Sequence, residues 1–207
     1  MNKSAFHDLS YGVYIVTSLD GKRRVGCVAN SIMQITSTPA TFAVSINRDN
    51  YTNGCIGDCG RFAISILPET ADSALIGTFG FSSSHDKDKF NGVNTLDKEG
   101  LPVIAAAKSY IVCRVIDKME TATHTVFLGE ALDADILNDG SVMTYAYYHS
   151  VIKGKAPKNA PTYIEEEKAE GSLWKCTICG YEHTADELPG GFTCPICGVP
   201  GEMFEKK

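Results

Sequence analysis

The sequence predicts a mainly β protein, in which an antiparallel barrel or sandwich with a few helices is followed by a small cysteine-rich domain. Two observations predict this class. Runs of β-branched and aromatic residues succeed one another through the first three quarters of the 207 residues, with few helical segments between them. Four of the eight cysteines form two close pairs near the C-terminus. Because strands do not alternate with helices, a doubly wound parallel sheet is excluded.

The expected elements of the first domain are bounded by turn and helix-start signals. Asp20-Gly21 predicts a hairpin turn between the first two strands. A polar start at Asn50 predicts a helix over 50–58, and Pro68 precedes a second predicted helix over 69–79. Strands are expected at residues 11–18, 24–29, 41–47, 62–67, 110–117 and 123–136.

The chain divides where its composition changes. The stretch 153–171 contains glycines, two prolines and the acidic run 165–167, a composition typical of a loop and a solvated linker. The sequence therefore predicts a first domain over 1–165, a linker over 166–171 and a second domain over 172–207.

Charge and hydropathy exclude two classes of partner. The formal net charge of −6 argues against binding to nucleic acid, whose phosphates require a basic surface. No apolar run is long enough for a membrane helix, and the N-terminus lacks the apolar stretch of a signal peptide. The sequence therefore predicts a cytoplasmic protein, in which cysteines serve as metal ligands or reactive thiols and not as disulfides.

The paired cysteines predict a metal site in the second domain. Two Cys-x-x-Cys pairs supply four thiolates, the set that closes a tetrahedral site on zinc or iron. A glycine follows each pair, and its conformational freedom lets the turn aim backbone N–H groups at the sulfurs. So short a domain needs the metal to fold, and its small core is expected to contain Trp174, Tyr181, Phe192 and Phe204. The expected ligands are Cys176, Cys179, Cys194 and Cys197.

Two polar segments of the first domain are candidates for ligand binding. Residues 28–36 end a strand with amide and hydroxyl groups, and residues 47–52 join a strand to the first helix. A helix N-terminus favours anions, so Arg48, Asn50 and Thr52 could hold a phosphate. The alternative is that Asn50 only caps its helix.

The order and spacing of several segments resemble known families. The first domain resembles the flavin reductase-like family, an FMN-binding split barrel of Greek-key type, and in particular its flavoredoxin-type members. The second domain resembles rubredoxin, with a shorter stretch between its cysteine pairs than free-standing rubredoxins have. The segments that carry the first resemblance are 11–17, 29–36, 47–52, 86–90, 124–130, 148–149 and 155–163, and those that carry the second are 174–181, 188–192, 194–199 and 203–205.

The resemblance to the flavin reductase-like family implies non-covalent FMN, a homodimer and roles for particular residues. Asn30 and Ser31 would hydrogen-bond the isoalloxazine edge, and Gln34 and Thr36 would line the path to the phosphate. Lys89 would reach the flavin as a cation, or else be a solvated charge, and His124 would be the catalytic group beside the flavin, or else a histidine satisfied at the barrel end. The residues that would hold the phosphate end are Asn47, Arg48, Asn50, Tyr51 and Thr52.

The combination of these two resemblances implies a protein that transfers electrons. The resemblance implies an oxidoreductase that passes electrons from NAD(P)H through FMN to a rubredoxin-type Fe(SCys)4 centre. From there they would reach an acceptor such as a flavodiiron protein, which reduces O2 or NO. Two alternatives stay open: a flavin reductase that supplies free reduced flavin and has a structural zinc ribbon, and a binding module without enzymatic activity.

Overall fold

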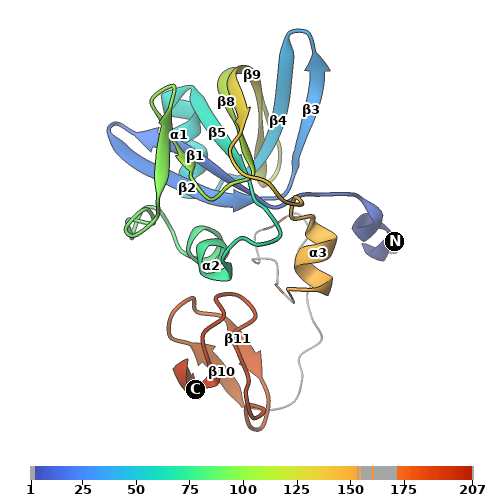
Figure 1. Cartoon of the computed structure of the whole chain (residues 1–207), viewed down its shortest axis with the longest axis vertical. Coiled ribbons are helices and arrows are strands. Elements are labelled where there is room, and N and C mark those ends of the chain that lie inside the picture. Colours follow the sequence, from blue (N-terminus) through green and yellow to red (C-terminus); the bar gives the residue numbers. More distant parts are fainter. Residues whose placement is uncertain (1–2, 153, 155–159, 161–171, 207) are drawn as a thin grey trace.

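The chain forms a curled antiparallel sheet with a smaller domain beneath it (Figure 1). The computed structural model describes residues 3–152, 154, 160 and 172–206. The main sheet has seven strands in the order β2-β1-β5-β8-β9-β4-β3, so β2 and β3 are its edges. The elements of the first domain are η1 (Lys3–Asp8), β1 (Tyr14–Asp20), β2 (Arg23–Ala29), β3 (Ile32–Ser37), β4 (Ala40–Asn47), α1 (Tyr51–Cys59), β5 (Arg61–Ile66), α2 (Ser73–Phe81), β6 (Thr95–Lys98), β7 (Leu101–Ile104), β8 (Ser109–Glu120), β9 (His124–Ile136) and α3 (Tyr145–Ser150).

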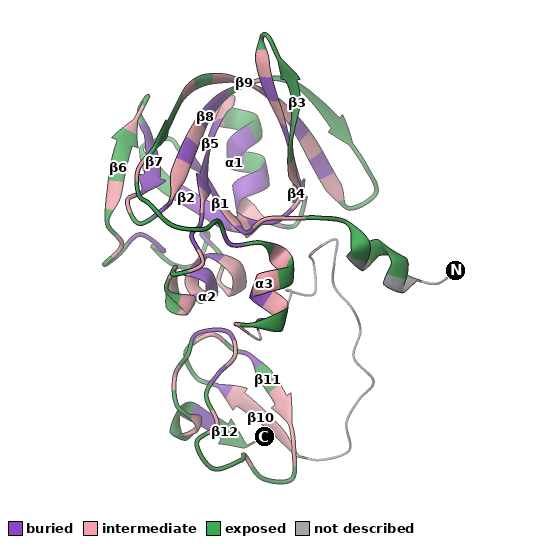
Figure 2. Cartoon of the chain, turned by 45° about the vertical axis from the view of Figure 1, so that its right-hand side comes forward, coloured by how far each residue is buried: buried purple, intermediate pink, exposed green. Residues whose placement is uncertain are grey.

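The core lies inside the curl of the sheet. Strand β4 alternates buried and half-buried residues over most of its length, whereas β5 is buried throughout 62–65; Val44, Ile46, Phe62 and Ile64 belong to one buried cluster. Helix α1 covers this cluster with Ile56, which is fully buried. Figure 2 shows the buried face of α1 turned toward the strands. A second cluster lies between the sheet, α2 and α3, so these two helices cover the side of the sheet that faces the smaller domain.

The second domain is built on a three-stranded sheet in the order β11-β10-β12. Its core is a small cluster that includes Tyr181, Phe192 and Phe204, with Trp174 packed against it, which confirms the predicted aromatic core. The Trp174 indole N–H donates to the carbonyl of Ala185 at 3.0 Å. The elements are β10 (Leu173–Cys176), β11 (Glu182–Thr184), η2 (Gly201–Met203) and β12 (Phe204–Lys206).

Most of the expected elements are confirmed. All six predicted strands form, and Gly21 in the predicted hairpin turn has φ +59°. The second helix begins at Ser73 and not at residue 69, because Asp72 caps it by accepting from the Ala74 N–H at 2.8 Å. The predicted linker over 166–171 lies outside the described residues.

Strand β3, the hairpin of β6 and β7, and the short helices η1 and α3 were not predicted from the sequence. The missed strand β3 is an edge strand on which all residues after the first are exposed. It therefore lacks the alternation between apolar and polar residues that identifies a half-buried strand. The other elements are short, and short elements carry a weak periodic signal.

Gly129 lies in β9 where the packing leaves no room for a side chain. A Cβ there would lie 2.6 Å from Cζ of Phe62 and 2.7 Å from Cβ of Cys113. We expect Gly129→Ala to reduce the free energy of unfolding by about 1–3 kcal/mol, because the added methyl group overpacks a dense core. Urea unfolding measures this change. Gly54→Ala is the control, since no atom lies within 4 Å of its Cβ position on α1. Equal stability of the two variants would contradict this account of the core.

Candidate metal centre and polar outer face

Two equivalent turns hold the four cysteines of the second domain. In the first turn the N–H of Gly180 donates to the carbonyl of Cys176 at 2.9 Å, and in the second the N–H of Gly198 donates to that of Cys194 at 2.9 Å. Both glycines have positive φ, +76° and +72°, which side-chain-bearing residues rarely adopt. We call the turns knuckle 1 (Cys176–Gly180) and knuckle 2 (Cys194–Gly198).

The cysteine sulfurs are arranged as a tetrahedral metal site requires. The Sγ atoms of Cys176 and Cys197 are 3.7 Å apart, those of Cys179 and Cys194 are 3.6 Å apart, and all four lie within 4.8 Å of one another. A tetrahedron with metal–sulfur bonds of about 2.3 Å has sulfurs about 3.8 Å apart. The donor set therefore fits zinc or iron, and the four predicted ligands come together.

The cysteine thiols differ in how readily they ionise. The hydrogen bond with Cys194 and then burial raise the pKa of Cys179, and burial raises the pKa of Cys197 to about 11, so the thiolate is favoured at Cys194. The pKa of Cys194 is lowered to about 5, because the Cys179 thiol and then the backbone N–H groups of Cys197 and Ile196 stabilise its thiolate. Thiolate, and not thiol, is the form that binds a metal. Hydrogen bonds of this kind also tune the reduction potential of an iron centre.

In the first domain, four polar residues share the outer face of strands β4 and β9. The side chains of Val44 and Ile46 point into the core, so the alternate residues Ser45 and Asn47 point outward. Asn47 pairs with His124. We call the surface formed by Ser31, Ser45, Asn47 and His124 the polar outer face.

The register of β3 brings Ser31 to this face. Ile32 pairs with Val44, so Ser31 lies opposite Ser45. The N–H of Ser45 donates to the carbonyl of Ser31 at 3.0 Å. Apolar side chains flank these groups, since Met33 pairs with Ala43 on the same face and is 64% exposed. An apolar surface with polar groups along one edge suits a flat heteroaromatic ring such as the isoalloxazine.

The segment from Asn47 to Thr52 is fixed by local hydrogen bonds. The N–H of Arg48 donates to the carbonyl of Thr123 at 2.9 Å, which ties this segment to the turn before His124. Asn50 accepts from the Thr52 N–H at 3.0 Å, so the capping role of Asn50 is confirmed. The Thr52 hydroxyl is buried and, among the described residues, has no hydrogen-bond partner. Tyr51 points away from this segment and donates to Asp20 at 2.8 Å.

The remaining predicted flavin contacts are more scattered. Asn30 is buried and accepts from the Ser31 hydroxyl at 3.1 Å. Gln34 and Thr36 are exposed at the other end of the β3–β4 hairpin, where Thr36 pairs with Thr41. Their roles in lining the flavin stay predictions.

Lys89 is not a solvated charge, so that alternative is wrong. It is only 3% exposed, and its Nζ donates to the carbonyls of Gly26 and Phe79 at 2.9 and 3.1 Å. It thereby joins the C-terminal turn of α2 to the edge strand β2. Its predicted contact with the flavin stays a prediction.

Ser45 is the candidate residue that sequence reasoning missed. The sequence placed it inside a predicted strand, and the alternation of that strand could have assigned it to the outer face. What the sequence lacked was the register with β3 and β9, which sets Ser45 beside Ser31 and His124. His124 is partly buried, which lowers its pKa, and its Nδ1 lies 2.8 Å from the Thr123 hydroxyl.

Comparison with protein families matches both domains. Residues 6–155 match the flavin reductase like domain. The chain belongs to the flavin reductase-like family. Residues 174–205 match the rubrerythrin, rubredoxin-like domain, so both resemblances expected from the sequence are confirmed. The fold is a flavin-binding one, and the tetrathiolate site lies in a rubredoxin-like domain.

Individual relatives share these features. The chain is 41% identical to the high molecular weight rubredoxin of Moorella thermoacetica, with 100% of both chains covered. It is 40% identical to the ferric-chelate reductase (NAD(P)H) of Archaeoglobus fulgidus, over 81% of this chain and 100% of that one. A solved NADH:FAD oxidoreductase of Streptomyces globisporus superposes with a TM-score of 0.63 at 26% identity, over 68% of this chain and 83% of that one. These relatives support a role in electron transfer.

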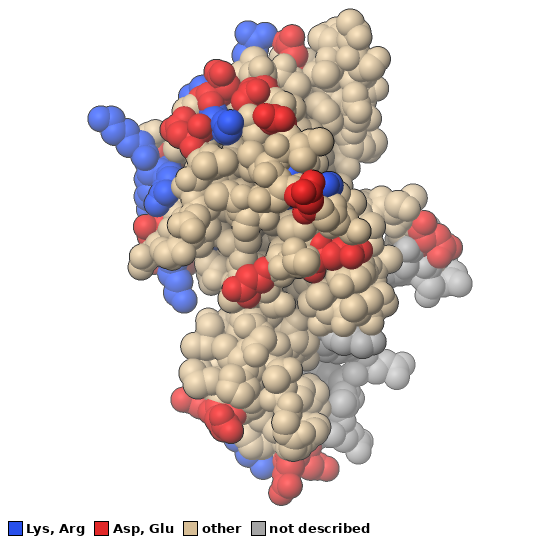
Figure 3. All heavy atoms as spheres, in the orientation of Figure 1, with Lys and Arg blue, Asp and Glu red and all other residues tan. Residues whose placement is uncertain are grey.

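Two further observations bear on the classes of partner. No helix in the described part of the chain combines the length and apolar character needed to span a bilayer. Over the described surface visible in Figure 3, acidic side chains are scattered over both domains and no broad basic surface forms.

We expect Cys194→Ser to lose the metal while FMN binding is retained. The substitution removes one of four ligands from a domain that folds around its metal, whereas the polar outer face belongs to the other domain. Metal analysis and flavin absorbance of the purified variant measure the two effects. Cys59→Ser, which alters a cysteine of α1, should keep both cofactors. Loss of flavin from Cys194→Ser would contradict independent sites.

Lys89 is expected to make stability depend on pH. Burial lowers the pKa of Lys89 from an ordinary value of 10.5 to about 8. Between these values the unfolded chain holds a proton that the folded chain has released, so stability rises with pH there, by at most about 1.4 kcal/mol per pH unit. Below about pH 8 both states are protonated and the slope vanishes.

Urea unfolding of the wild type and of Lys89→Met between pH 7 and 10 measures this effect. The free energy of unfolding of the wild type, minus that of the variant, should rise above about pH 8. Lys87→Met, which removes an exposed lysine two residues away, is the control. A difference that is constant over this range would contradict a buried Lys89.

Proposed function

We propose that this protein is an NAD(P)H-dependent oxidoreductase that passes electrons through FMN to an Fe(SCys)4 centre, and from there to an external redox acceptor. The observation that carries the proposal is the tetrathiolate cage, whose sulfur spacing suits a tetrahedral metal, in the same chain as a flavin reductase-like domain. The similarity to a high molecular weight rubredoxin over the whole chain supports the combination. The similarity to ferric-chelate reductase (NAD(P)H) supports the nicotinamide donor.

The residues of the chain would bind and orient the two cofactors. Bound FMN would take two electrons as a hydride from NAD(P)H and give them up singly, which suits an iron that accepts one electron at a time. Ser31, Ser45 and Asn47 would offer hydrogen bonds along one edge of the ring. His124 would orient a donor or hold a proton at Nε2, since its Nδ1 faces Thr123.

A flavodiiron protein is the acceptor we propose, and a homodimer is the assembly. The dimer is supported by the edge strand β3, whose side chains Met33 and Ile35 are 64% and 48% exposed. Edge strands with exposed apolar side chains are common sites of association. We place the protein in the cytoplasm, where eight cysteines remain thiols or metal ligands.

A flavin reductase with a structural zinc ribbon is the second candidate, because the same sulfur tetrahedron accommodates zinc. In that case the metal would stabilise the second domain and take no part in electron transfer. The two candidates differ in how many electrons each chain accepts.

An anaerobic titration with NADH or NADPH distinguishes the candidates. Each nicotinamide supplies two electrons, FMN takes two and Fe(III) takes one, so the iron form should consume about 1.5 equivalents per chain. The zinc form should consume about 1.0, since zinc is redox-inactive. Absorbance is followed separately in the flavin and iron-thiolate bands, with metal content measured on the same sample. Iron that stays oxidised after full reduction of the flavin would contradict the proposed function.

A further inference from the structure

Helix α2 packs on both domains at once, with opposite faces. Ile76 and Phe79 point into the core of the first domain. Ser73 and Phe81, eight residues apart and therefore on one face of the helix, border the second domain: Ser73 lines a cleft with Cys194 and Pro195, and Phe81 packs against the core of the second domain. In both Figure 1 and Figure 2, α2 lies directly between the sheet and the second domain.

Gly77 lies midway along the face of α2 that meets the second domain. A Cβ at this position would lie 3.2 Å from Cβ of Cys197 and 3.5 Å from the carbonyl oxygen of Ile196. The 3.2 Å distance is tighter than an ordinary van der Waals contact and the 3.5 Å distance already is one, so a side chain much larger than a methyl group would push knuckle 2 away from the helix. The absence of a side chain at Gly77 is therefore what lets a metal ligand approach the first domain so closely.

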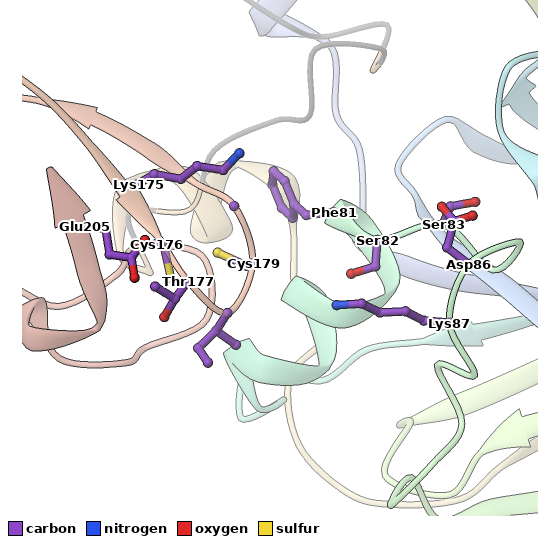
Figure 4. A pocket seen from close by; sticks show the side chains of 12 residues that line it. Phe81, Ser82, Ser83, Asp86, Lys87, Lys175, Cys176, Thr177, Cys179 and Glu205 are labelled. Atoms are coloured by element: carbon purple, nitrogen blue, oxygen red, sulfur yellow. The ribbon is translucent and has the colours of Figure 1, made fainter. Parts of the chain in front are cut away.

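The two knuckles differ in exposure although their sequences are equivalent. Ile178 occupies the third position of knuckle 1 and is 51% exposed, whereas Ile196 occupies the same position of knuckle 2 and is 0% exposed. Knuckle 2 is covered where it meets α2. Knuckle 1 borders a cleft of about 630 Å³, into which Lys175 and Lys87 extend from the two domains (Figure 4).

Hydrogen bonds to strand β2 fix the position of α2. Lys89 donates to the carbonyl of Phe79 near the end of α2 and to the carbonyl of Gly26 in β2. Ser84, which follows the helix, exchanges hydrogen bonds with both the N–H and the carbonyl of Gly26, at 3.1 and 3.0 Å. Helix α2, on which knuckle 2 packs, is thus bound to the sheet by hydrogen bonds and would not move with the second domain.

We infer that Gly77 is a positioning residue for electron transfer between the two domains: it seats knuckle 2 on α2, so that the metal receives electrons on this side and knuckle 1 stays open to the acceptor. This inference rests on the proposed function. The step conserves electrons, because one electron leaves the reduced flavin domain and converts Fe(III) to Fe(II), and two such transfers follow each NAD(P)H with release of one proton. Close contact matters, because the rate of electron tunnelling falls exponentially with the distance between donor and acceptor.

Stopped-flow reduction of the iron- and FMN-loaded full chain by NADH tests this role. In Gly77→Leu we expect flavin reduction at the wild-type rate and iron reduction slowed severalfold or more, since the leucine displaces knuckle 2 and lengthens the path of the electron. Ala74→Leu adds the same side chain at an exposed position of the same helix and should leave both rates unchanged. Gly77→Ala adds only one methyl group and should give a smaller effect in the same direction.

A second measurement does not depend on activity. Hydrogen–deuterium exchange of the zinc-loaded chain should speed up across 73–81 and 194–198 in Gly77→Leu and stay at the wild-type rate in Ala74→Leu. If iron reduction and exchange are the same in the two leucine variants, the role of Gly77 is wrong. If instead the wild-type iron is not reduced at all, the proposed function fails, and this result is distinct because it appears before any substitution is made.

Discussion

The contact of helix α2 with both domains is the constraint on which the arrangement of the whole chain depends. One face of the helix completes the core of the first domain, and the other meets the metal-binding knuckle. A short helix can do this only if its two faces differ, with large apolar residues toward the core and Gly77 toward Cys197. The helix therefore sets where knuckle 2 meets the first domain.

Each site is preorganised in a different way. The tetrathiolate cage depends on local structure, since two turns of the same sequence pattern each place two sulfurs, and glycines of positive φ close them. The polar outer face depends on the sheet, because Ser45 lies in β4, His124 lies in β9 and Ser31 directly precedes β3. In a flexible chain, ordering either set of groups around a ligand would cost conformational entropy. The folded scaffold holds the groups in place before the ligand binds, so this cost does not arise on binding.

Lys89 is a buried charged residue whose hydrogen bonds join two elements of the first domain. The ammonium group of Lys89 is costly to bury, yet its hydrogen bonds to Gly26 and Phe79 satisfy two carbonyls at the junction of β2 and α2. Its sequence neighbours Asp86 and Asp88 suggested a surface charge. Only the packing of α2 against β2 encloses it.

The sequence by itself determined the strands with buried faces, the cap of the first helix by Asn50 and the four metal ligands. These features depend on local periodicity and on spacings of a few residues, which the sequence shows directly. The tertiary structure alone decided that β3 is an exposed edge strand, that Ser45 joins Ser31 and His124, that Lys89 is buried and that knuckle 2 packs on Gly77. Each of these depends on the register between strands or on contacts between residues far apart in the chain, and no local pattern encodes such contacts.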